Sequence, residues 1–133
     1  MFAIVRSAID VPALARQAAA DSCGALVTFS GVVRDRSDDG RPVCGLSYEA
    51  HEEMAIAEFE KIAREARERF GARGIAVVHR IGDLNVGEIA VAVAVSSPHR
   101  AEAFDACEYV IDELKARAPI WKRDFANAFP DRR

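Results

Sequence analysis

Residues 96–124 constrain the possible fold more than any other stretch of the chain. They follow an apolar run, residues 89–95, whose length and composition are typical of a buried strand. Ser97 is a favourable N-cap residue and Pro98 suits the first helical position, so the pattern predicts that a helix begins here. Pro119 predicts where it ends, because the residue before a proline avoids helical backbone angles. We therefore expect a strand that leads directly into a long helix.

The predicted helix is amphipathic. Its apolar side chains recur at spacings of three and four residues, which places them on one face. They are Phe104, Cys107, Val110, Ile111 and Leu114. We expect this face to pack against the core.

Further strands and helices are predicted along the rest of the chain. Strands are expected at residues 2–6, 24–33, 43–50, 75–79 and 88–95, and helices at 10–20, 52–70 and 98–117. An apolar stripe from Met54 to Phe70 marks the middle helix. Because the strands come in adjacent pairs, this order favours an α+β fold with a mostly antiparallel sheet and three helices.

The connections carry predictions of their own. Residues 43–50 are expected to return beside the preceding strand as a hairpin, after a polar loop at 34–42, and residues 81–87 are expected to form a turn. Gly31 indicates either a bulge, a close approach by another backbone or ligand, or the end of its strand. The 133 residues fit a single domain, with a loose tail at 125–133.

Composition excludes several classes of function. The chain has 18 basic and 21 acidic residues, a net charge of −3, which weighs against broad binding to nucleic acids or anionic membranes. No apolar run reaches the length of a membrane span and no signal peptide is apparent, so we expect a cytoplasmic protein. The three cysteines are far apart, which indicates a reducing compartment without disulfides. The chain has no close cluster of His and Cys residues, so we expect no zinc site.

Basic residues lie at both ends of the long helix. His99 and Arg100, with the free backbone N–H groups of the first turn, make either an anion site or ordinary solvated charge. Lys115 is either a functional amine or a favourable cation at a helix C-terminus. Lys122 follows bulky apolar residues and is either functional or a surface lysine. Local chemistry alone leaves these alternatives open.

The length of the helix separates the basic residues at its start, His99 and Arg100, from Lys115 near its end. His99 and Lys115 are 16 residues apart, which corresponds to roughly 24 Å along a straight helix. One small ligand cannot touch both within one chain. Either they serve different sites, or a second copy brings its His99–Arg100 end to Lys115. We adopt the second possibility as a hypothesis, a site shared across a homodimer.

Three segments carry a family resemblance. They are GALVTFSGVVRD at 24–35, LSYEAHEEMA at 46–55 and residues 77–124, which include the elements HRIG, GE, SxHR, AF and LKxRxPIWK. In order and spacing these elements resemble the large, catalytic subunit of molybdopterin synthase, the MoaE family.

The resemblance implies a fold, a reaction and partners. The fold would be an α/β hammerhead, and the protein a homodimer with one small ubiquitin-like sulfur-carrier subunit at each distal end, a heterotetramer. The carrier's C-terminal Gly-Gly bears a thiocarboxylate. The enzyme, a sulfurtransferase, would use two such sulfurs to convert cyclic pyranopterin monophosphate (precursor Z) into molybdopterin, the dithiolene ligand of molybdenum cofactor. No cofactor or metal is implied.

The resemblance also implies the site residues. Lys115 and Lys122 would be the two catalytic lysines. The substrate-binding residues would be Phe29, Val32, Val33, Arg34, His99, Arg100, Lys115, Lys122, Arg123 and Asp124, with His99 and Arg100 supplied by the neighbouring subunit. Ile111 and Glu113, which flank Lys115, are expected at the channel for the carrier tail.

The implied chemistry suits these residue types. Arg34, His99 and Arg100 can hold a cyclic phosphate by charge-assisted hydrogen bonds. Hydrolysis of an acyl-linked intermediate needs proton transfers, for which the two lysines supply positive charge and a proton donor or base. The alternative is a non-catalytic dimeric module that binds a phosphorylated metabolite. Such a module has no need of both lysines, so their joint presence favours the enzyme.

Overall fold

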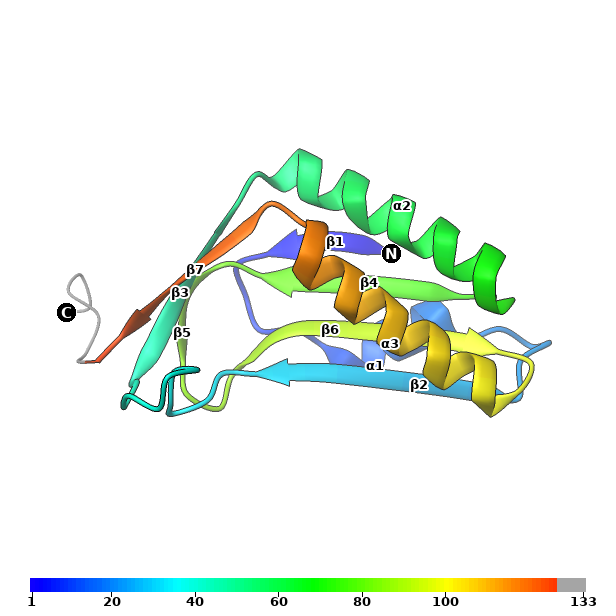
Figure 1. Ribbon diagram of the computed structural model, residues 1–133. Helices are drawn as coiled ribbons and strands as arrows, with labels where there is room; N and C mark the ends of the chain where they lie inside the picture. The colour runs from blue at the N-terminus through cyan, green and yellow to red at the C-terminus, as the bar shows by residue number, and fades with distance from the viewer. Residues whose placement is uncertain (127–133) are drawn as a thin grey trace.

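The computed structural model describes residues 1–126 as two β-sheets and three helices (Figure 1). In chain order the elements are β1 (Phe2–Val5), α1 (Val11–Ala18), β2 (Ala25–Val32), β3 (Gly45–Ala50), α2 (Glu52–Phe70), β4 (Ile75–Arg80), β5 (Gly82–Asn85), β6 (Ile89–Ser97), α3 (Arg100–Arg117) and β7 (Ile120–Phe125). Among these residues no helix is both long and apolar enough to cross a membrane. Most of the predicted tail lies outside the described residues, and its first residue belongs to β7.

The larger sheet has four strands in the order β1-β4-β6-β2, with α2 and α3 on one face and α1 on the other (Figure 1). β1 runs parallel to β4, whereas β4 and β2 both pair antiparallel with β6. For the described residues, the predicted α+β fold with a mostly antiparallel sheet and three helices is confirmed.

The sequence of β6 explains how this sheet accepts helices on both faces. Val91, Val93 and Val95 pack in the cluster formed with α2 and α3. The alternate residues Ala92 and Ala94 pack against α1. Successive side chains of a strand point to opposite faces, so large residues fill one side and small ones admit the short helix closely on the other. Burying each valine contributes about 1.5–3 kcal/mol.

α3 begins later than predicted. Ser97, predicted as its N-cap, is fully buried and pairs with Ala25 at the end of β6. His99 is the N-cap residue, without a side-chain hydrogen bond, and the helix runs from Arg100 to its predicted stop before Pro119. The local pattern missed this boundary because pairing with β2 extends the strand, and sheet context overrides local preference.

Two side chains predicted on apolar helix faces are exposed. Phe104 of α3 is 60% exposed and Met54 of α2 is 56% exposed. On α3, Ala103 and Ala106 take the buried positions instead, which lets the helix lie close to the sheet. The other four predicted residues of this face are buried as predicted: Cys107, Val110, Ile111 and Leu114.

The smaller sheet, β5-β3-β7, is antiparallel and was only partly predicted. β3 does not form a hairpin with β2, because it pairs with β5 and β7 instead. The stretch 81–87, predicted as a turn, contains β5, and the residues after Pro119 form β7.

Gly31 marks the place where the chain leaves the larger sheet. The register between β2 and β6 shifts between Gly31 and Val32, which confirms a bulge among the predicted alternatives. A Cβ on Gly31 would lie 2.6 Å from Cγ1 of Val91, so the side chain of Val91 occupies the space that a larger residue would need here. Such a bulge bends the strand and ends regular pairing, which directs the following residues toward the second sheet.

The two sheets meet at a small joint. Its buried apolar cluster consists of Val33, Leu46, Leu84 and Ala90. Beside it the ring of Tyr48 on β3 meets that of His79 on β4, with centroids 4.7 Å apart and planes at 76°. His79 is 5% exposed, and its Nδ1 lies 2.8 Å from the carbonyl oxygen of Arg80. Because a carbonyl only accepts, Nδ1 is the donor of the neutral ring.

Gly74→Ala is expected to destabilise the protein. A Cβ at Gly74 would lie 1.8 Å from the carbonyl oxygen of Ala18. The backbone cannot shift freely, because Gly74 N donates to Ser96 Oγ at 3.0 Å and Ser96 N donates to Gly74 O at 2.8 Å. Overpacking of this kind costs about 1–3 kcal/mol. Denaturant unfolding of the variant beside the wild type measures the loss, and an unchanged midpoint would contradict the clash.

His79 is expected to make stability depend on pH below neutrality. Burial lowers the pKa of His79 from its usual value of 6.5, so the unfolded chain takes up this proton at a higher pH than the folded chain. The contribution of His79 to the free energy of unfolding is therefore complete above about pH 6.5. It is lost as the pH drops below that value, because the unfolded chain is then stabilised by taking up the proton. Denaturant unfolding at several pH values should show a shallower fall in His79→Gln. The same flattening in His99→Gln, which removes an exposed histidine, would contradict burial as the cause.

Candidate active site

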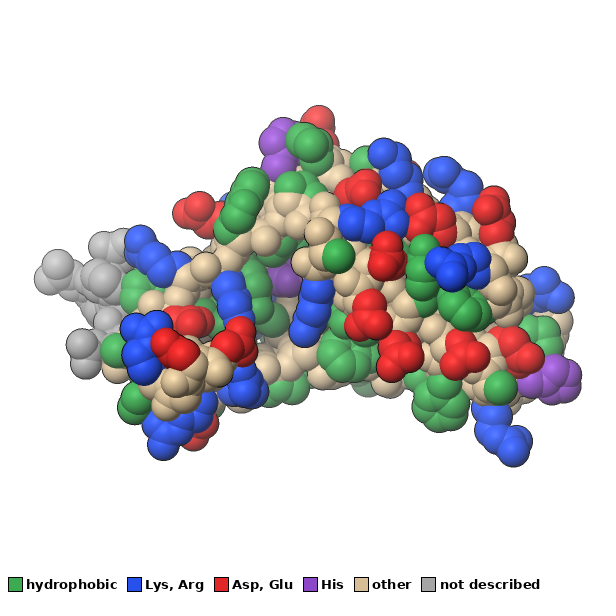
Figure 2. Space-filling model, in the orientation of Figure 1, with side chains coloured by type: hydrophobic (Ala, Val, Ile, Leu, Met, Phe, Trp, Pro, Cys, Tyr) green, Lys and Arg blue, Asp and Glu red, His purple; other side chains and the backbone are tan. Residues whose placement is uncertain are grey.

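A cavity of about 430 Å³ lies where the two sheets meet the C-terminal end of α3. In Figure 2 it is the hollow left of centre, with basic side chains on its sides. Its walls come from the end of β2 and the following loop, from β3, β4 and β6, and from α3 and β7. Segments far apart in the sequence therefore build one site.

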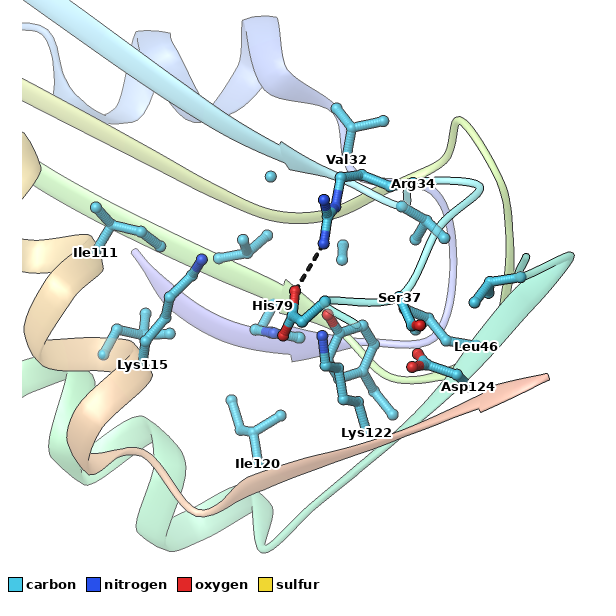
Figure 3. Close-up of a pocket in the computed structure, with 18 of the residues that line it drawn as sticks. Val32, Arg34, Ser37, Leu46, His79, Ile111, Lys115, Ile120, Lys122 and Asp124 are labelled. Carbon is cyan, nitrogen blue, oxygen red and sulfur yellow. Dashed lines mark hydrogen bonds and ion pairs between the residues drawn. The ribbon is translucent and has the colours of Figure 1, made fainter. Parts of the chain in front are cut away.

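Basic groups outnumber acidic ones in this cavity. The basic residues are Arg34, Arg36, Lys115 and Lys122, and the acidic residues are Asp38 and Asp124. Figure 3 shows Lys115 pointing in from the end of α3 and Lys122 from β7. Charge-assisted hydrogen bonds from such groups suit an anionic ligand.

The end of α3 that carries Lys115 is held on α2 by Arg117. Nη1 and Nη2 of Arg117 lie 2.6 and 3.0 Å from the two carboxylate oxygens of Glu65, and Nε lies 3.3 Å from Glu58. Hydrogen bonds from Arg117, and then from Tyr109, lower the pKa of Glu65 to about 2. Because Lys115 lies two residues before Arg117, this contact fixes the backbone from which Lys115 extends.

An apolar wall stands beside Lys115. Ile111 and Leu114, one turn and one residue earlier on α3, both line the cavity. Ile111, predicted to line the channel for the carrier tail, therefore lines this cavity. Glu113, predicted with it, does not line the cavity and instead pairs with Arg117 at 3.3 Å.

β7 positions Lys122 by pairing it with Tyr48 of β3. Side chains alternate along a strand, so Lys122 and Asp124 line the cavity whereas Arg123 does not. The guanidinium of Arg123 instead lies 5.0 Å from the ring centroid of Phe125. The structure therefore does not place Arg123 in the predicted substrate site of its own chain.

The segment at the end of β2 is partly as predicted. Val32, Val33 and Arg34 line the cavity. Phe29 does not, because it packs on the core cluster formed by the larger sheet with α2 and α3.

His99 and Arg100 are remote from the cavity. They sit where α3 begins, at the opposite end of this 18-residue helix from Lys115 (Figure 1). This continuous helix keeps His99 roughly 24 Å from Lys115, the separation expected from the helical rise. One chain alone does not bring the two basic clusters together.

Five polar residues of the cavity were not predicted: Arg36, Ser37, Tyr48, His79 and Asp38. Burial, and then the charge of Asp124, raises the pKa of Tyr48, and burial lowers that of His79, so both are neutral near pH 7. Side chains alternate between the two faces of a strand, so residues 43–50 place Leu46 and Tyr48 on the same face. This alternation is the sequence signal that could have indicated Tyr48. Within residues 1–126, no group of three or more His, Cys, Asp and Glu side chains could hold a metal ion.

Comparison with known proteins identifies relatives. Residues 4–117 match the family model described as MoaE protein. The molybdopterin synthase catalytic subunit of Pyrococcus abyssi is 50% identical over 103 residues, which cover 77% of this chain and 69% of that protein. The subunit of the same name from Nostoc sp. PCC 7120 is 45% identical over 124 residues, 92% of this chain and 74% of that protein.

Solved structures agree with these relatives. Molybdopterin synthase from Staphylococcus aureus matches with a TM-score of 0.90 at 37% identity, over 96% of this chain and 93% of that chain. A complex of subunits 1 and 2 of molybdopterin-converting factor from Helicobacter pylori contains a chain that matches with a TM-score of 0.76 at 29% identity, over 92% of this chain and 83% of that one. The chain therefore belongs to the MoaE family.

Proposed function

We propose that this chain is the catalytic subunit of molybdopterin synthase and that the cavity between its sheets is the site of sulfur transfer. The substrate is cyclic pyranopterin monophosphate, and the product is the dithiolene molybdopterin. The observation that carries the proposal is the convergence of Arg34, Lys115 and Lys122 on one cavity, from three separate elements.

The basic groups suit the charge that changes during the reaction. Arg34 binds the substrate phosphate, and its planar guanidinium matches two phosphate oxygens. Lys115 and Lys122 lie near the reacting carbons. They stabilise the oxyanion that forms when water attacks the acyl-linked intermediate, and they exchange protons with the leaving groups. Removing one such preorganised donor costs about 10²–10³-fold in kcat in other enzymes.

Sulfur reaches this site on a partner. A small ubiquitin-like carrier inserts its thiocarboxylated Gly-Gly tail beside the apolar wall of Ile111 and Leu114. The Helicobacter pylori complex of two subunits, which contains a chain similar to this one, supports such a partner. The three cysteines therefore need no role in the chemistry: Cys23, Cys44 and Cys107 are free, and burial raises the pKa of Cys107 to about 11. Free thiols fit a cytoplasmic location.

The second half of the anion site comes from another copy of the chain. His99 and Arg100 cannot reach their own Lys115, as the length of α3 dictates. In a two-fold dimer each subunit lends its His99–Arg100 end to the cavity of the other, which forms two equivalent sites. Two carriers then complete a heterotetramer.

Lys115→Ala should abolish most of the sulfur transfer without unfolding the protein. With thiocarboxylated carrier and precursor, we expect kcat for dithiolene pterin to fall by about 10²–10³-fold. Lys61→Ala, which removes an exposed lysine of α2 paired with Glu58 at 3.7 Å, is the matched control and should keep the wild-type rate.

Two other results would change this assignment. Wild-type turnover in Lys115→Ala would leave Lys115 as a helix-terminal cation only. Precursor binding without product in the wild type would favour a non-catalytic binding module.

Mixing two inactive variants should restore activity if the site is shared. A dimer of Lys115→Ala with Arg100→Ala has one site with both defects and one with neither. After random subunit exchange, about a quarter of all sites are intact, so about a quarter of wild-type activity is expected. No recovery, with exchange verified by mass spectrometry, would place Arg100 outside the neighbouring site.

A further inference from the structure

We infer that Asp38 is an internal competitor for the anion site, holding Arg34 until an anionic group of the substrate displaces it. The inference rests on the proposed function only in naming that group as the phosphate of the pterin. It assigns Asp38 a modest role in specificity, because a ligand gains more from Arg34 when it compensates for the lost carboxylate.

The contact itself is direct. Nη2 of Arg34 lies 2.7 Å from Oδ1 of Asp38, the dashed line in Figure 3, and both residues line the cavity. A guanidinium binds carboxylate and phosphate oxygens with the same donor geometry. The carboxylate of Asp38 therefore takes a position on Arg34 that a phosphate oxygen would otherwise use.

The loop presents Asp38 through its own hydrogen bonds. Ser37 N donates to Arg41 O, Gly40 N to Ser37 O, and Val43 N to Asp35 O, each at 2.9 Å. Gly40 has φ +86°, a left-handed conformation that suits glycine. These contacts make residues 35–43 a self-supporting hairpin that needs no help from Arg34. The backbone that carries Asp38 is thus held by contacts other than the ion pair with Arg34.

The pair is suited to exchange. The Arg34 and Asp38 side chains are 63% and 84% exposed, and ion pairs between exposed groups are weak. Lys115 and Lys122 line the same cavity as Arg34 and can add their charge to that of Arg34 around a phosphate, whereas the ion pair of Asp38 is with Arg34. A multiply charged phosphate therefore outcompetes Asp38, and a singly charged ion such as chloride gains much less.

Asp39 provides a matched control. It lies next to Asp38 on the same hairpin but does not line the cavity. Hydrogen bonds from Ser37 and then Arg41 lower its pKa to about 2, so it is charged at neutral pH. Asp38→Asn and Asp39→Asn each remove one negative charge from the hairpin, but only Asp38→Asn frees Arg34.

The test is a titration of the full-length chain with inorganic phosphate, in which ³¹P NMR measures the binding of phosphate. We expect Asp38→Asn to bind phosphate more tightly than wild type and Asp39→Asn, by about fivefold at most since the broken pair is exposed. Adding Arg34→Gln to Asp38→Asn should remove the gain. Equal affinity in the two single variants, a gain that survives Arg34→Gln, or no phosphate binding by any chain would each overturn the inference.

Turnover assays separate this inference from the proposed function. With thiocarboxylated carrier, Asp38→Asn should lower KM for the precursor relative to Asp39→Asn. Normal wild-type turnover with no difference in KM or phosphate affinity sinks the role of Asp38 and leaves the function standing. A phosphate gain in Asp38→Asn without turnover in any chain sinks the function and leaves the competition standing.

Discussion

Packing of α3 against the larger sheet is the constraint on which the site depends. The buried face of the helix ends at Leu114, so the next residue, Lys115, lies at the margin of the core. The ion pairs of Arg117 with α2 then hold the last turn. Pro119 ends the helix, and the chain continues at once into β7, which carries Lys122. One packed helix and one short connection therefore place both lysines on the same cavity.

Gathering cations in one cavity opposes folding, because like charges repel. Exposure of Arg34, Lys115 and Lys122 keeps their charges hydrated, and Asp38 and Asp124 supply counter-charge in the same cavity. The result is a site with surplus positive charge that a substrate anion can neutralise. Tyr48 and His79, which also line the cavity and are neutral near pH 7, add polar groups without changing that balance.

Local patterns predicted the elements whose cause is local. α2 has its predicted bounds because its apolar stripe, its acidic first turn and Gly71 at its end lie within one stretch. β5 and β7 were missed because their cause is not local: β5 has four residues, and both exist by pairing with β3. Family resemblance indicated Lys115, Lys122 and Arg34. No periodicity marked Asp38, whose role depends on a hairpin that folds over a cavity.

The helical rise is also the reason for proposing that a complete site needs two chains. α3 keeps His99 and Arg100 roughly 24 Å from Lys115, farther than one small substrate reaches. In the proposed two-fold dimer the two copies of α3 are related by the symmetry axis, so each helix would contribute its N-terminal end to one site and its C-terminal end to the other. Inserting one helical turn would displace these ends by about 5.4 Å and disturb both sites together. The length of α3 is therefore as much a part of the proposed site as the side chains at its ends.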